Sequence, residues 1–78
     1  MTTPRDDLES LRRRADDLEV GQEALEAFGE IFELDPDDRA AANMVGRSLE
    51  HLGHRELARD HWTLVTELQP DNAIAASG

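Results

Sequence analysis

Apolar residues recur at intervals of three and four positions along most of the chain, which is the spacing of one face of an α-helix. Each of four such stripes is followed by a glycine or a proline, the residues that commonly end helices. The stripes are Leu8, Leu11, Ala15 and Leu18; Ala24, Leu25, Phe28, Ile31 and Phe32; Ala42, Val45, Leu49 and Leu52; and Ala58, Trp62 and Val65. The pattern therefore predicts an all-α fold.

The residues that flank the stripes predict where the helices begin and end. Thr3 is a candidate cap for the first helix, and Pro4 suits the first helical position because its missing N–H costs nothing there. Gly21 is expected to end that helix. The later helices are predicted over 22–34, 38–52 and 55–68, with Gly53 as a left-handed cap after the third.

One segment of the chain returns after thirty-four residues. The segment 33–38 (ELDPDD) recurs as 67–72 (ELQPDN). Four structural positions recur with it, since Ala24, Phe28, Ile31 and Pro36 correspond to Ala58, Trp62, Val65 and Pro70. A fixed period of this length is typical of repeat architectures.

The second copy, residues 39–72, also carries the pattern of a known family. Its small residues and its aromatic residue follow the order Ala42-x-x-Val45-Gly46-x-x-Leu49, then Gly53, then Ala58-x-x-x-Trp62, and finally Pro70. The chain resembles a tetratricopeptide repeat protein, whose pattern is W-x-x-L-G-x-x-Y, A-x-x-x-F and a late proline. It departs from that pattern at Ala42, where the family has tryptophan, and at Leu49, where it has tyrosine.

The resemblance implies an α-solenoid of two antiparallel helix-turn-helix repeats within one domain. The repeats would span about 5–38 and 39–72, and a short C-terminal helical fragment would follow at 73–78. Two repeats fall short of the three or so that such stacks need, and a short tail is a poor cap. We therefore expect another contact to complete the stack.

Three positions bear on how tightly the helices pack. The resemblance implies that a small residue at Gly46 lets the paired helix lie close. In the first copy Arg12 stands at the place of Gly46 and Glu19 at that of Gly53, which leaves the closeness of the first helix pair open. We expect Trp62 to be a core anchor rather than an exposed binding residue.

Charge and composition narrow the classes of function. Eighteen acidic residues against eight arginines give a net charge of −10, which repels phosphate backbones and anionic lipids. The acid-flanked arginines at 12–14 are expected to form a solvated charged face rather than an anion site. The chain has no cysteine, no apolar run long enough for a membrane span and no targeting signal at its acidic N-terminus, so we expect a cytoplasmic protein. Arginine without lysine hints at a GC-rich bacterial genome.

The sequence offers little that points to catalysis. No glycine-rich phosphate loop is present, and the carboxylates alternate with solvent-facing positions. His51 and His54 lie on either side of Gly53, so they do not share a helix face as a two-histidine metal site requires. We expect no catalytic, cofactor-binding or metal site and no enzyme activity.

The resemblance implies a concave groove lined by the first helix of each repeat. Arg13 and Arg47 occupy equivalent places on those helices, and two arginines with an asparagine suit a carboxylate from a partner's tail. The candidate groove residues are Glu9, Arg13, Asn43, Arg47 and Glu50. Ion pairing of the two arginines with nearby acids, among them Asp6, Asp16, Asp17 and Glu50, is the favoured alternative to ligand capture.

A second apolar stripe runs along the fourth helix beside its core stripe. Its members are Leu57, His61, Leu64 and Leu68, whereas Glu23, Ala27, Glu30 and Leu34 hold the equivalent places in the first copy. An exposed apolar row usually marks an interface. We predict that this stripe, with Trp62 or Ile74 nearby, forms a homodimer with two-fold symmetry. In the alternative, the tail folds back and Ile74 covers the row.

These features predict a module that binds another polypeptide, as an adaptor or assembly protein that includes its own copy among its partners. The alternative is a structural fragment of a longer repeat array with no ligand of its own.

Overall fold

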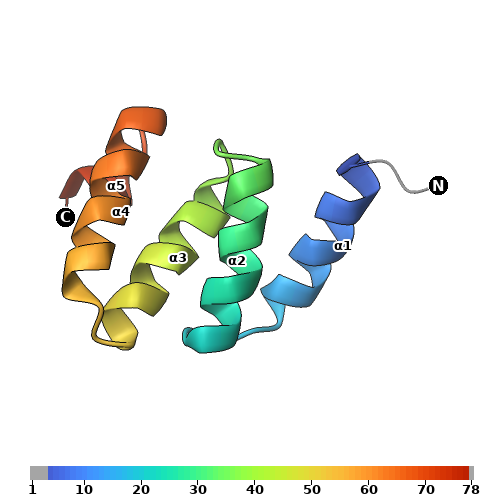
Figure 1. Cartoon of the computed structure of the whole chain (residues 1–78). Coiled ribbons are helices and arrows are strands. Elements are labelled where there is room, and N and C mark those ends of the chain that lie inside the picture. The colour runs from blue at the N-terminus through green and yellow to red at the C-terminus, as the bar shows by residue number, and fades with distance from the viewer. Residues whose placement is uncertain (1–3, 78) are drawn as a thin grey trace.

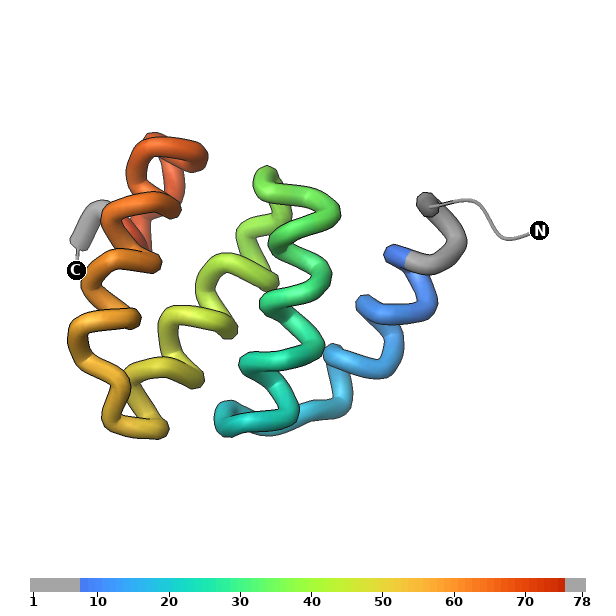
Figure 2. The backbone as a smooth tube through the Cα atoms, viewed as in Figure 1, coloured from blue at the N-terminus to red at the C-terminus, as the bar shows by residue number. Residues whose placement is uncertain are grey.

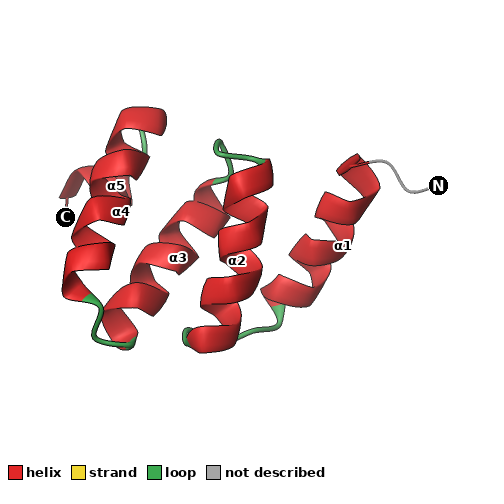
Figure 3. Ribbon diagram, viewed as in Figure 1, coloured by secondary structure: helices red, strands yellow, loops and turns green. Residues whose placement is uncertain are grey.

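The computed structural model describes the backbone of residues 4–77 and the side chains of residues 8–75. The expected Thr3 cap lies outside this range. The described chain is helical with short turns and contains no strand (Figure 3). Its helices are α1 (Pro4–Asp16), α2 (Gln22–Leu34), α3 (Arg39–His51), α4 (Arg55–Leu68) and α5 (Ala73–Ser77). The all-α prediction is confirmed, and the predicted bounds of the second, third and fourth helices agree to within one residue.

The helices follow one another in a row, and each packs on the helix before it and the helix after it (Figure 1). The tube in Figure 2 shows that successive long helices run in opposite directions, with the short α5 beside α4. The principal extents are 39 × 25 × 16 Å, so the molecule is longer along one axis than the others. None of the described helices is long and apolar enough to cross a membrane.

Small residues dominate the core, which allows the helices to approach closely. One buried cluster has members from each of the four helices α1, α2, α3 and α4. It consists of Ala15, Ala24, Phe28, Ile31, Ala41, Val45, Leu49 and Ala58. A second joins α3, α4 and α5 through Ala42, Val65 and Ala75. Phe32 and Trp62 are partly buried and pack against both clusters, so they connect them.

The first helix ends earlier than the sequence predicted. It stops at Asp16, and the Leu18 N–H bonds to the Ala15 carbonyl 2.9 Å away in the turn that follows. Gly21 does not end α1 but precedes α2, with φ +156° and ψ −163°. Because only glycine readily adopts this conformation, Gly21 sets the direction in which the chain enters α2.

Gly53 has the left-handed conformation predicted for it, with φ +84°. The His54 N–H bonds to the Leu49 carbonyl at 2.9 Å, and the Gly53 N–H bonds to the Glu50 carbonyl at 3.1 Å. These are the two hydrogen bonds of a Schellman motif, which satisfies carbonyls left without a partner at a helix end. The glycine therefore ends α3 and turns the chain into α4.

The turns after α2 and α4 have the same hydrogen-bonding pattern. The Asp35 N–H bonds to the Ile31 carbonyl at 2.8 Å, and the Asp38 N–H to the Asp35 carbonyl at 3.0 Å. Thirty-four residues later the Gln69 N–H bonds to the Val65 carbonyl at 2.6 Å, and the Asn72 N–H to the Gln69 carbonyl at 2.9 Å. The side-chain oxygens of Asp38 and Asn72 then cap α3 and α5 by accepting from Ala41 N and Ala75 N. The recurring segments thus form matching turns.

Arg12 holds α1 against the first of these turns. Its Nε donates to Asp38 Oδ2 at 2.8 Å, and its terminal nitrogen donates to Asp35 Oδ2 at 2.7 Å. Arg13 and Arg14 are exposed, as a solvated charged face predicts, whereas Arg12 is partly buried and pairs with acids of the turn. Arg12 therefore joins α1 to the turn that precedes α3.

Buried amides join the second turn to the first. Gln69 and Asn72 are 4% and 3% exposed. Gln69 Nε2 donates to the Pro36 carbonyl at 2.8 Å, while Asn72 Nδ2 donates to Asn43 Oδ1 at 3.0 Å and to Gln69 Oε1 at 2.9 Å. Since buried polar groups must be hydrogen-bonded, this network fixes how the α4–α5 turn sits on α3.

Candidate functional site

Three leucines on one side of α4 form an exposed apolar row. Leu57, Leu64 and Leu68 are 56%, 44% and 43% exposed, and we call them the leucine row. The tail does not cover them, because α5 packs through Ala75 in the Val65 cluster while Ile74 remains 41% exposed. The alternative in which Ile74 folds back over the row is therefore wrong.

His61 does not belong to the exposed row in which the sequence placed it. It is half-buried, with Nε2 2.7 Å from the Ala42 carbonyl of α3. Its ring meets Phe32 of α2 edge-on, with the ring centroids 5.4 Å apart. The polar imidazole thus turns inward to reach a backbone acceptor, which a pattern of apolar positions does not reveal.

Burial lowers the pKa of His61 below its ordinary value because the charged imidazolium loses hydration. The hydrogen bond with the Ala42 carbonyl acts in the opposite direction but is the weaker influence. The neutral ring, with its Nε2 proton donated to Ala42, fits this position near neutral pH. His61 therefore joins α4 to α3 through a contact that favours the neutral imidazole.

No hydrogen bond or ion pair of the described residues joins the candidate groove residues to one another. Asn43 is half-buried and accepts from Asn72, and Glu50 accepts from Trp62 Nε1 at 3.2 Å. Glu9, Arg13 and Arg47 are exposed, and their side chains make no hydrogen bond to another described residue. Asn43 and Glu50 thus accept hydrogen bonds from side chains of the same chain.

The expected ion pairs of Arg13 and Arg47 with nearby acids are not found within residues 8–75. The ion pairs of that range join Arg12 to Asp35 and Asp38, and Arg39 to Asp71. Asp6, one of the acids named from the sequence, has its side chain outside the described range.

Trp62 is only partly the core anchor predicted from the sequence. Its ring lies against Gly46, where an added Cβ would overlap the indole. The close approach inferred at Gly46 is therefore real, but it is made by this side chain. Trp62 is half-buried, unlike Phe28, which is 5% exposed at the equivalent position. The remaining part of the indole lines a hollow.

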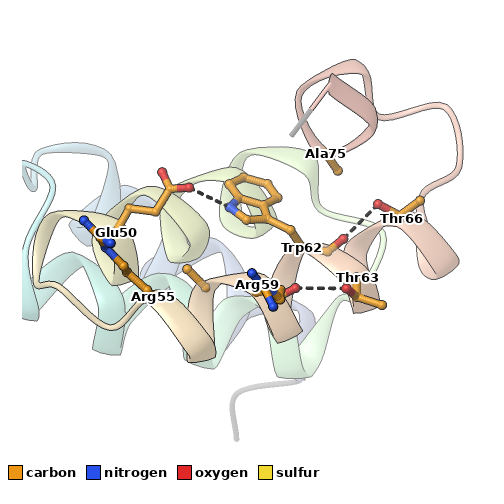
Figure 4. Close-up of a pocket in the computed structure, with 8 residues that line it drawn as sticks. Glu50, Arg55, Arg59, Trp62, Thr63, Thr66 and Ala75 are labelled. Carbon is orange, nitrogen blue, oxygen red and sulfur yellow. Dashed lines mark hydrogen bonds between the residues drawn. The ribbon is translucent and has the colours of Figure 1, made fainter.

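That hollow lies along α4 between the end of α3 and the short α5 (Figure 4). It has a volume of about 490 Å³ and an open mouth. Its lining includes Glu50, Arg55, Arg59, Trp62, Thr66 and Ala75. Both threonines of its wall, Thr63 and Thr66, donate to carbonyls one turn back, so their hydroxyl oxygens remain as acceptors (Figure 4). We call this feature the α4 hollow.

Sequence reasoning missed the two arginines of the α4 hollow. Arg55 and Arg59 are exposed, lie one turn apart and make no ion pair with any described residue. The signal was available, since Gly21 and Leu25 hold the equivalent places in the first copy. In the second copy two exposed arginines therefore stand where the first copy has a glycine and a leucine.

Within the part of the chain that the structure describes, no group of three or more histidine, aspartate or glutamate side chains is arranged to hold a metal ion. No protein-family model, curated protein or solved structure matches this chain. The function of this chain is therefore inferred from the geometry of α4 and its neighbours.

Proposed function

We propose that this protein is a non-catalytic, tetratricopeptide-like interaction module of the cytoplasm that binds other polypeptides and associates with a second copy of itself through α4. The observation that carries the proposal is the leucine row. Its three leucines lie on one side of the last long helix, and each leaves about half of its surface in water. Full burial of a leucine side chain stabilises by roughly 1.5–3 kcal/mol, so a contact that covers the row would gain a substantial part of that free energy for each leucine.

The matching turns at 35–38 and 69–72 support the repeat arrangement in this proposal. Both follow the thirty-four-residue period, and both end in a side-chain cap for the next helix. In a stack of such units each pair buries a face against its neighbour, and the terminal pair keeps one face open. The net charge of −10 favours a protein partner over nucleic acid or an anionic membrane.

The test is the mass of the protein in solution at tens of micromolar. Wild type is expected to be dimeric, and Leu64→Glu is expected to be monomeric because it places a carboxylate in the middle of the row. Leu34→Glu is the matched control, since Leu34 is 54% exposed on α2 with glutamates at the neighbouring places of its face. The proposal is contradicted if wild type is a monomer. It is also contradicted if Leu64→Glu and Leu34→Glu dissociate the dimer to the same extent.

The alternative is a structural piece of a longer repeat array without an independent ligand. It predicts a chain whose thermal midpoint does not depend on concentration, whereas a dimer is stabilised by mass action as concentration rises. Helical circular dichroism followed from a few micromolar to a few hundred micromolar separates the two.

A further inference from the structure

The α4 hollow corresponds to a surface that another helix covers elsewhere in the same chain. Its wall positions on α4 lie thirty-four residues after Gly21, Ala24, Leu25, Phe28 and Phe32 of α2. On α2, Ala24 and Phe28 belong to a buried cluster that contains Ala15 of α1 as well as Ala41, Val45 and Leu49 of α3. Helix α2 therefore packs between two helices, and its contact with α3 is a seat for the following helix. On α4 the equivalent seat is the one where α5 packs.

The short α5 fills only the start of that seat. Its five residues, Ala73–Ser77, hold the places of the first five residues of α3, and Ala75 is buried as Ala41 is. Beside α5 the described residues leave this face of α4 open, and Arg55, Arg59 and part of Trp62 line the opening (Figure 4). Room therefore remains for a helix in the place that the later turns of α3 occupy on α2.

The chemistry of the open part differs from that of α2. Arg59 stands where α2 has Leu25, and Thr66 where it has Phe32. An apolar helix such as α3 would remove water from Arg55 and Arg59 without offering them a partner, and burial of an unpaired charge costs free energy. Ala58 and Trp62 still provide an apolar floor. The surface suits a helix with small apolar residues on one side and carboxylates beside them.

The contacts of α3 indicate where those carboxylates belong. Ser48 Oγ of α3 lies 3.4 Å from the backbone nitrogen of Gly21, and Gly21 corresponds to Arg55. A helix that lies on α4 as α3 lies on α2 therefore brings the residue in the place of Ser48 next to Arg55. It also runs antiparallel to α4, so its carboxyl end, which carries the negative end of the helix dipole, approaches the arginines.

We propose that the α4 hollow binds an acidic helical segment of a partner protein, antiparallel to α4, with carboxylates in its last turns paired with Arg55 and Arg59. The inference rests on the proposed function only in taking the protein to bind polypeptides, and its site is on a different side of α4 from the leucine row. Because the whole chain carries −10 and Glu50 stands at the rim, the segment carries one or two placed carboxylates rather than a long acidic tract.

The test uses a fluorescein-labelled, alanine-rich helical peptide that has two glutamates four residues apart near its C-terminus and no tryptophan. A second peptide has glutamine at both places. Anisotropy measures the affinity, and the emission of Trp62, the single tryptophan of the chain, reports binding beside the indole. The acidic peptide is expected to bind more tightly than the glutamine peptide and to shift that emission.

Replacing both arginines, as Arg55→Gln with Arg59→Gln, is expected to weaken the acidic peptide by roughly five- to tenfold, as fits two partly exposed ion pairs. Arg14→Gln is the matched control, because Arg14 is also exposed and makes no ion pair with a described residue. It is expected to leave the affinity unchanged. Circular dichroism of each variant confirms that the helices are retained.

The proposal is overturned by equal binding or by no binding of the two peptides, by equal weakening in Arg14→Gln, or by dissociation of the self-associated protein into monomers when Arg55 and Arg59 are replaced. The last would show that a second copy occupies the hollow. The acidic peptide is also expected to bind the Leu64→Glu variant as it binds wild type. A failure of self-association through the leucine row is therefore distinguishable from a failure at the hollow.

Discussion

The indole of Trp62 occupies the space that a side chain at Gly46 would need. A Cβ built at Gly46 would overlap the six-membered part of the Trp62 ring, and no small shift of a flexible chain end relieves this. The same ring packs against both buried clusters and donates from Nε1 to Glu50 at the rim of the α4 hollow. The glycine in α3 thus determines how the ring lies between the core and the hollow.

Gly46→Ala is therefore expected to destabilise the protein although alanine favours helices. Overpacking costs typically 1–3 kcal/mol, against a gain of about 1 kcal/mol in helix propensity, so a net loss of up to about 2 kcal/mol is expected in urea unfolding. Gly29→Ala is the matched control, since Gly29 is also helical but has open space where its Cβ would lie. It is expected to stabilise by up to about 1 kcal/mol. Equal effects of the two substitutions would contradict the packing argument.

Arg12→Gln removes the ion pairs that tie α1 to the turn before α3. Arg12 and Asp35 are 40% and 33% exposed, so solvent screens much of the attraction, and a loss of about 1 kcal/mol in unfolding free energy is expected. Arg13→Gln removes the same charge from an exposed side chain without an ion pair in the described range, and it serves as the control. The difference between the variants is expected to shrink in 1 M NaCl. A difference that does not depend on salt would mean that Arg12 acts by packing.

The helices could be predicted from the sequence because their signals are local, whereas much of the site depends on residues far apart in the chain. Helix bounds follow from local signals, such as the apolar spacing and the Schellman glycine at Gly53, which act within a few residues. The inward turn of His61 depends on a carbonyl of α3 nineteen positions away, and the reach of Arg12 on acids more than twenty positions away. Periodicity of one helix carries no information on such partners.

The exposure of the leucine row was predictable for a related reason. Comparison with Glu23 and Glu30 at the equivalent places of α2 marked Leu57 and Leu64 as unusual for that face. The same comparison at Gly21 and Leu25 points to Arg55 and Arg59. Positions at which the two copies of the repeated segment differ therefore indicate exposed surfaces, whereas positions that are alike in both copies indicate the core.

His61 is expected to make the free energy of unfolding depend on pH below about pH 7, where an ordinary imidazole begins to bind a proton. Its pKa is lowered by burial in the folded state, so between the folded and unfolded pKa values the unfolded chain binds more protons. Stability is then full above the unfolded pKa and falls as the pH drops toward the folded one. His61→Gln should reduce the loss of unfolding free energy between pH 7 and pH 5. If His61→Gln keeps the full pH dependence, the carboxylates rather than the imidazole control it.

Salt is expected to strengthen self-association through the leucine row. Glu56, Asp60 and Glu67 are exposed and lie beside or one turn from Leu57 and Leu64 on α4, so a two-fold contact brings like charges together. Screening at 500 mM NaCl reduces this repulsion and leaves the apolar burial intact, so sedimentation equilibrium should give a lower dissociation constant than at 50 mM. Binding of the acidic peptide to Arg55 and Arg59 should respond in the opposite way, because screening weakens attraction between unlike charges. If salt weakens self-association instead, the copies meet through ion pairs, and the leucine row is not their contact.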